Sequence, residues 1–164
     1  MHSKIIKDAK FSSCRRYRYA LWRIWDKSKA RALFIGLNPS TGDEIKDDPT
    51  IMRCIKFAKS WDCGGVYLTN LFAYRSSSPR EMMIFRNPIG NENDKWIKKL
   101  SEKSTIIIAA WGNQGIHLNR SRIIEDKIPN LKYLKKNKSG QPSHPLYLKS
   151  NLKPKPLKEK HMKK

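Results

Sequence analysis

The sequence is poor in cysteine and has no long apolar run, and both shortages limit the class of protein. Its three cysteines form no C-x-x-C pair, which argues against a disulfide framework or a zinc ribbon and fits a reducing compartment. No stretch approaches the ~20 apolar residues of a membrane span, and residues 1–10 lack the apolar core of a secretory signal. We therefore expect a cytoplasmic protein that does not enter a membrane.

Acidic residues are also scarce: 14 Asp and Glu stand against 35 Lys and Arg, which gives the 164 residues a formal charge of +21. Self-repulsion of this size does not stabilise a fold, so we expect a polyanionic partner, of which nucleic acid is the commonest. A protein of the membrane surface would carry an amphipathic basic helix with aromatics on one face, and no clear helix of that kind is present. The alternative is a basic surface kept for solubility alone, although added acids serve solubility better.

Short apolar runs alternate with helical patterns along the chain. Four runs predict buried strands, at residues 32–37, 66–68, 105–111 and 131–134. Helical spacing predicts three helices, which begin at Asp48-Pro49, span residues 91–103, and run from Asn113 to residue 127. The aromatic and basic segment 15–25 suits a strand better than a helix.

The order βαβαβαβ predicts an α/β fold, a three-layer αβα sandwich around a central four-stranded, mainly parallel sheet, because parallel strands need right-handed crossovers. We expect residues 1–150 to form this single domain, and we expect it to be a monomer. Residues 151–164 are too polar to bury a core and are expected to form a disordered basic tail.

Neutral hydrogen-bonding side chains follow the predicted strands. Asn38 follows the first strand, Asn70 the second and Asn113 the third, while His144 comes after the fourth. Ligands of open parallel sheets bind at the carboxyl ends of the strands, so these groups should share one site. Amides and an imidazole can read the edge of a flat heterocycle without the desolvation cost of buried charge. Because Gly36 lies in no G-x-G-x-x-G or P-loop motif, we expect a nucleobase pocket and not the site of a nucleotide-binding transferase.

These residues resemble the motifs of the uracil-DNA glycosylase superfamily, and more closely a branch long known only as a domain of unknown function. The resemblance spans residues 30–148. The turn G-L-N-P at residues 36–39 resembles the first motif in its mismatch-specific version, in which the Asn positions the attacking water. Residues 66–70 resemble the strand whose last Asn reads the target base, and residues 107–112 resemble the third strand.

The second motif of that superfamily, H-P-S-x-L, is matched by His144-Pro145 and Leu148 but has Leu146 in place of the Ser that contacts a phosphate. Ser143 is the candidate substitute. Residues 42–54 do not resemble the pocket loop of the familiar uracil enzymes, which leaves the identity of the base open. Three cysteines cannot supply the four ligands of the iron–sulfur cluster found in some branches, so we expect neither a cofactor nor a metal.

The resemblance implies a monofunctional DNA glycosylase, which flips a base and hydrolyses its N-glycosidic bond to leave an abasic site. Asn38 would hold the water without acting as a general base, since a carboxamide accepts no proton at neutral pH. Neutral His144 would donate to a base carbonyl that gains negative charge. The same strand ends would complete the base site with Gly36, Leu37, Pro39 and Asn70. The plainer interpretations are an Asx-turn for Asn38, a strand end for Asn70 and an ordinary loop histidine for His144.

Asp43, Asp47 and Asp48 form the only acidic cluster, next to the first motif. The favoured interpretation is that Asp48 caps a helix that begins at Pro49. In the alternative, Asp43 or Asp47 binds polar groups of an enlarged base, such as a glucosylated hydroxymethylcytosine of phage DNA, or acts as a general base. Uracil is slightly preferred as the target because it leaves readily as an anion. Modified cytosine comes second and would imply an antiviral role.

Base flipping needs an apolar wedge and contacts to phosphates. The predicted wedge is Leu146, Tyr147 and Leu148. The predicted phosphate contacts lie in the long loop and after the wedge: Arg75, Arg80, Arg86, Lys149, Lys153 and Lys155. The plainer interpretation of these basic residues is solvated charge. The rival from another class is a noncatalytic nucleic-acid-binding module on the same fold, which would need none of the polar groups at the strand ends.

Overall fold

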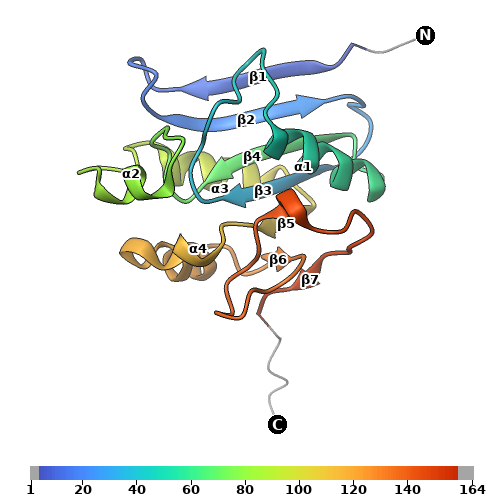
Figure 1. The fold of residues 1–164 in the computed structure, drawn as a ribbon. Coiled ribbons are helices and arrows are strands. Elements are labelled where there is room, and N and C mark those ends of the chain that lie inside the picture. The colour runs from blue at the N-terminus through green and yellow to red at the C-terminus, as the bar shows by residue number, and fades with distance from the viewer. Residues whose placement is uncertain (1–3, 159–164) are drawn as a thin grey trace.

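A seven-stranded sheet forms the centre of the protein in the computed structural model, which describes residues 4–158 (Figure 1). The strands lie in the order β1-β2-β4-β3-β5-β6-β7. Their bounds are β1 (Ile6–Phe11), β2 (Arg18–Ile24), β3 (Arg31–Gly36), β4 (Gly65–Asn70), β5 (Ile106–Ala109), β6 (Lys132–Tyr133) and β7 (Lys155–Pro156). Strand β3 pairs in parallel with β4 and β5, and β5 with β6, whereas the pairs β1–β2, β2–β4 and β6–β7 are antiparallel.

The four predicted parallel strands correspond to β3, β4, β5 and β6. The predicted number of strands was wrong, because the sheet has seven strands and not four. The strand expected within residues 15–25 is β2, which joins the sheet next to β4. Strand β1 forms the outer edge and is exposed or half-buried along its whole length. An edge strand has one neighbour and needs no continuous apolar run, which is why the search for apolar runs missed it.

Helices cover both faces of the sheet, and their bounds are α1 (Pro49–Ser60), α2 (Pro79–Ile84), α3 (Asn93–Glu102) and α4 (Arg120–Lys127), with 3-10 turns η1 (Asn113–Asn119) and η2 (Pro145–Tyr147). The predicted start of α1 is confirmed, because the carboxylate of Asp48 accepts the main-chain N–H of Ile51 at 2.9 Å. The helix predicted from Asn113 is interrupted, since Leu118 adopts φ 52°. Asn113 caps no helix, and its side-chain oxygen accepts hydrogen bonds from a neighbouring loop instead.

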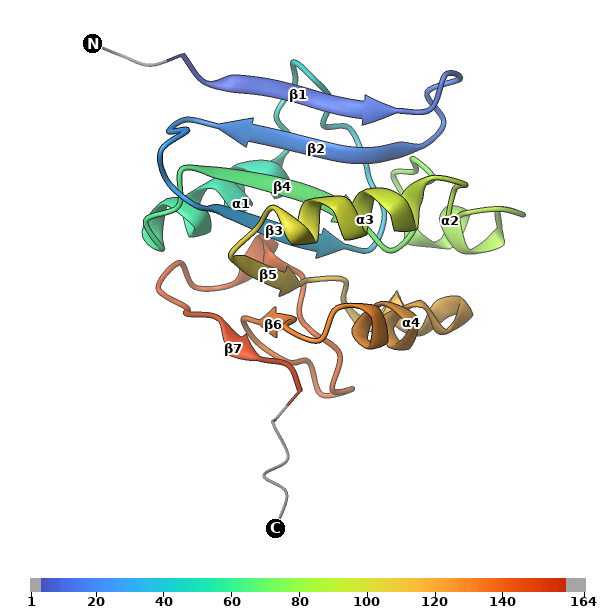
Figure 2. The same ribbon diagram turned by 180° about the vertical axis from the view of Figure 1, so that it is seen from behind.

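The core is divided by the sheet into two apolar clusters. Leu33 and Ile35 of β3 face the cluster that includes residues of α3 and α4, while Ala32 and Phe34 face the cluster that includes residues of α1. Figures 1 and 2 show α1 on one side of the sheet and α3 on the other. This alternation along β3 follows from the strand period of two, and it produces the three expected layers.

The first part of the expected disordered tail is ordered. Lys155 and Pro156 form β7 beside β6, and the N–H of Leu157 donates to the main-chain oxygen of Leu131 at 2.9 Å. Leu152 and Leu157 also pack against the two apolar clusters of the core, so two apolar side chains attach this polar segment to the domain. Residues 159–164 of the predicted tail lie outside the described residues. Among residues 4–158, no helix is long and apolar enough to cross a membrane.

Candidate functional site: a polar pocket at the strand ends

A cavity of about 260 Å³ lies where β3, β4 and β5 end, beside α1 and η2. Six of the predicted site residues line it: Gly36, Leu37, Asn38, Pro39, Asn70 and His144. Sequence reasoning missed other lining residues, among them Arg18, Ser76 and Gln114, and it gave Asp48 no role beyond its cap. The carboxyl ends of the parallel strands therefore meet at one polar site, as their direction requires.

Asn38 is held by its amide nitrogen. Its Nδ2 donates to the main-chain oxygens of Ser76 at 3.1 Å and of Pro39 at 3.5 Å. Within residues 4–158 its Oδ1 takes part in no hydrogen bond, including the one that an Asx-turn would require. An amide oxygen whose nitrogen is fixed in this way can accept a hydrogen bond from a water molecule in the cavity.

Asn70 lies at the end of β4, with 4% of its surface exposed. Its Oδ1 accepts a hydrogen bond from Nη2 of Arg18 at 3.3 Å, and its main-chain oxygen accepts one from Nδ2 of Asn93 at 2.8 Å. A Cβ atom at Gly36 would lie 2.8 Å from Nδ2 of Asn70. Glycine is therefore needed at the end of β3 so that the Asn70 carboxamide can occupy this part of the pocket.

Two buried opposite charges, those of Arg18 and Asp48, lie at the pocket and are bridged by the main chain of Gly42. The Gly42 carbonyl accepts from Nη1 of Arg18 at 2.9 Å, and the Gly42 N–H donates to Oδ2 of Asp48 at 3.1 Å. The hydroxyl of Ser40 donates to the same carboxylate oxygen at 3.2 Å. Burial lowers the pKa of Arg18 to about 10, with the charge of Asp48 acting in the opposite direction. Arg18 therefore remains a cation at neutral pH, and its charge is balanced within the protein.

His144 lines the cavity and also reaches solvent. Its Nδ1 accepts the main-chain N–H of Leu146 at 3.2 Å. Burial of part of the ring lowers the pKa of His144, and the charge of Asp48 offsets this effect in part. The ring is therefore neutral at pH 7, and because Nδ1 is an acceptor, the proton resides on Nε2. This tautomer provides one N–H donor.

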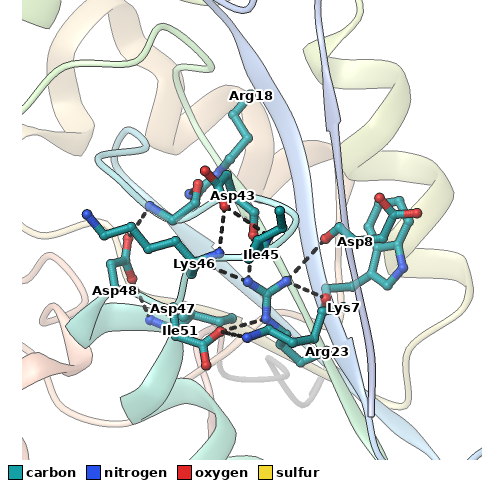
Figure 3. A network of polar contacts seen from close by, with 12 residues as sticks. Lys7, Asp8, Arg18, Arg23, Asp43, Ile45, Lys46, Asp47, Asp48 and Ile51 are labelled. Carbon is teal, nitrogen blue, oxygen red and sulfur yellow. Dashed lines mark hydrogen bonds and ion pairs between the residues drawn. The ribbon is translucent and has the colours of Figure 1, made fainter. Parts of the chain in front are cut away.

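Asp43 does not line the cavity, which differs from the prediction that it binds the base. Its Oδ1 accepts the main-chain N–H groups of Ile45 at 2.9 Å and Lys46 at 2.6 Å, and these bonds lower its pKa (Figure 3). Its carbonyl oxygen accepts from Nη2 of buried Arg23 at 2.6 Å. The carboxylate thus closes a local turn through Oδ1, outside the cavity.

Asp47 does not line the cavity either. Its Oδ1 accepts from Nε of Arg23 at 2.8 Å and lies 3.3 Å from Nζ of Lys7 (Figure 3). Although burial alone would raise the pKa of Asp47, these two cations lower it. Asp48 is the acidic residue of this cluster that lines the cavity, and the favoured interpretation of it as a helix cap is confirmed.

The predicted wedge residues differ in exposure. Tyr147 has 92% of its surface exposed, whereas Leu146 is half-buried and Leu148 packs against the apolar cluster beneath α1. Ser143 is buried, and its hydroxyl donates to Oδ1 of Asn137 at 2.5 Å. Tyr147 is therefore the wedge candidate that projects from the surface, and Ser143 is not available to a phosphate.

The predicted phosphate contacts also differ in exposure, and Arg86, Lys153 and Lys155 are exposed. Lys149 and Arg80 are exposed. Arg75 is half-buried, donates from Nη1 to the main-chain oxygen of Arg15 at 3.2 Å and stacks over the ring of Phe11 at 4.7 Å. Lys149 and Arg80 are therefore free to meet an anion, while Arg75 already contributes to the local structure.

The fold and the site define an α/β protein with a polar pocket at the carboxyl ends of its parallel strands. The chain belongs to the family described as Protein of unknown function (DUF1643), whose model matches residues 18–146. The match begins at Arg18 and contains Asn38, Asn70 and His144. Comparison with curated proteins gave no match, and comparison with solved structures gave none either.

Proposed function

We propose that this protein is a DNA glycosylase of the uracil-DNA glycosylase type. The observation that supports the proposal most is the position of Asn38, Asn70 and neutral His144 around one small cavity. The three residues offer an acceptor for a water, an amide for the edge of a base, and an N–H donor. These are the groups that hydrolysis of a deoxynucleoside requires when no general base takes part.

In the proposed reaction, the bond between C1′ and the base nitrogen breaks and its electron pair leaves with the base. Nε2–H of His144 donates to a carbonyl of the base on which negative charge develops. The water held by Oδ1 of Asn38 forms the new bond to C1′ and releases a proton to solvent. Because Asn38 cannot accept that proton, most of the rate must come from stabilising the departing base and from the charge of the DNA phosphates.

DNA is the proposed partner because the chain carries +21. Exposed Arg80 and Lys149 are suited to contact phosphates, and Tyr147, two residues before Lys149, is suited to fill the space left by a flipped base. We also propose a monomer in the cytoplasm, the compartment that the three cysteines without a C-x-x-C pair favour.

We propose uracil as the preferred base and modified cytosine as the second choice. Excision of modified cytosine would imply a role in antiviral defence. The carboxylate at the pocket is that of Asp48, and it already accepts hydrogen bonds from Ile51, Gly42 and Ser40. A carboxylate with these partners has little capacity left for the hydroxyls of an enlarged base or for proton transfer. A base that leaves as an anion therefore suits the pocket better.

The test uses duplexes and single strands that contain uracil, mismatched thymine, hydroxymethylcytosine or its glucosylated form, with abasic sites scored by alkaline cleavage. We expect excision by the wild type and a loss of roughly a hundredfold or more in Asn38→Ala and His144→Ala, with DNA binding retained. Asn130→Ala changes an exposed asparagine and is the matched control. Binding without excision of any base would contradict the proposal and favour the noncatalytic module.

A further inference from the structure

Arg18 has 1% of its surface exposed, although most basic residues of this chain face solvent. Its Nη1 donates to the carbonyl of Gly42 and its Nη2 to Oδ1 of Asn70, while Nε is buried without a partner in the described part of the chain. Burial of a guanidinium with an unsatisfied N–H costs free energy. This costly group lies directly at the pocket, so packing alone does not explain its position.

The contact with Arg18 determines which way the Asn70 carboxamide faces. A guanidinium only donates hydrogen bonds, so the group that faces it must be the oxygen of Asn70. The NH2 group then lies over Gly36, at the position where a Cβ atom would be 2.8 Å away. Both residues line the cavity, and within residues 4–158 this NH2 group has no hydrogen-bond acceptor.

We propose that Arg18 is a positioning residue, which fixes the NH2 group of Asn70 as a donor toward the bound base. The pocket then recognises a base through an acceptor atom, either a ring carbonyl oxygen or an unprotonated ring nitrogen. That the ligand is a base of DNA rests on the proposed function, whereas the orientation of Asn70 rests on its contact with Arg18. As negative charge develops on that acceptor, the chain of hydrogen bonds from Arg18 through Asn70 to the base strengthens.

A double-mutant cycle tests whether Arg18 acts through Asn70. Arg18→Lys keeps the positive charge but replaces the two guanidinium nitrogens that bond Gly42 and Asn70 with a single ammonium nitrogen on a differently shaped side chain, and it should slow base release roughly tenfold to a hundredfold. The double variant Arg18→Lys, Asn70→Ala should be no slower than Asn70→Ala alone. Arg16→Lys makes the same change at an exposed position two residues away and is the control. Losses that multiply in the double variant would overturn the proposal, because they indicate a general structural role.

A second readout does not depend on catalysis. The side-chain amide signal of Asn70 in a ¹⁵N NMR spectrum is identified by its loss in Asn70→Asp, which is isosteric and can pair with Arg18. In Arg18→Lys this signal should shift and its protons should exchange faster with water, while in the wild type it should shift when free uracil is added. An unchanged signal in Arg18→Lys would overturn the proposal even if the protein excises bases. A shifted signal in a protein that excises none would refute the proposed function and leave the positioning role standing.

Discussion

Replacement of Asp48 by alanine should destabilise the protein more than loss of an ordinary helix cap. The side chain caps α1 through Ile51, and it also accepts the buried N–H of Gly42 at 3.1 Å. Loss of a cap costs roughly 0.5–2 kcal/mol, and a buried N–H without an acceptor costs roughly 1–3 kcal/mol. We therefore expect Asp48→Ala to lower the free energy of unfolding by about 1.5–5 kcal/mol, with a fall in Tm of roughly 3–20 °C.

Urea denaturation of three variants separates the two contributions. Asp48→Asn keeps an oxygen for the cap but turns an NH2 group toward Gly42 or Ser40, so it should lose mainly the second contribution. Ser78→Ala removes the cap of α2, a single bond of 3.4 Å to the N–H of Glu81, and should cost about 0.5 kcal/mol. The reasoning fails if Asp48→Ala is no less stable than Ser78→Ala, since the network around Gly42 would then contribute nothing.

Three further predictions concern DNA and pH. DNA affinity should fall steeply with salt, because a charge of +21 implies the release of several counterions; an affinity independent of salt in a filter-binding titration would contradict this. Since the pKa of His144 is lowered from its ordinary value of 6.5, the neutral ring persists below that pH. The midpoint of the decline in base release as the pH falls should therefore lie below 6.5, and a midpoint above 6.5 in a pH–rate profile would count against His144 as the neutral donor. Tyr147→Ala should slow excision from duplexes more than from single strands, because only a duplex needs its gap filled; equal losses on both substrates would remove the wedge assignment.

Apolar runs were sufficient to predict the parallel centre of the sheet, and the cap signal at Asp48-Pro49 was sufficient to predict the start of α1. The edge strands were harder to predict, because β1 and β7 are stabilised by pairing with one neighbour and contain no continuous apolar run. The strand-end rule brought Asn38, Asn70 and His144 to one edge without any knowledge of side-chain contacts. Parallel direction alone is enough for that inference.

The choice among the three aspartates needed contacts that lie far apart in the sequence. Arg23 bonds the main chain of Asp43 and Lys46 and the carboxylate of Asp47, across about 20 positions of sequence (Figure 3). No spacing rule relates a strand residue to the loop that folds around it. A buried arginine also cannot be told from a solvated one by composition when the chain has 35 basic residues.

The basic residues of this chain therefore divide into two groups with opposite physical roles. Arg18 and Arg23 are each 1% exposed, and their donors are directed at the carbonyls of the loop that leads to Asp48. Arg18 lines the pocket, whereas Arg23 holds the loop beside it, and both are shielded from salt because screening acts weakly on buried charges. Exposed residues such as Arg80 and Lys149 contribute to the net charge that attracts a polyanion and are screened in full. Under the proposed function, affinity for DNA and the geometry of the pocket depend on different arginines and lysines, so a variant should be able to change the salt dependence of binding without changing the orientation of Asn70.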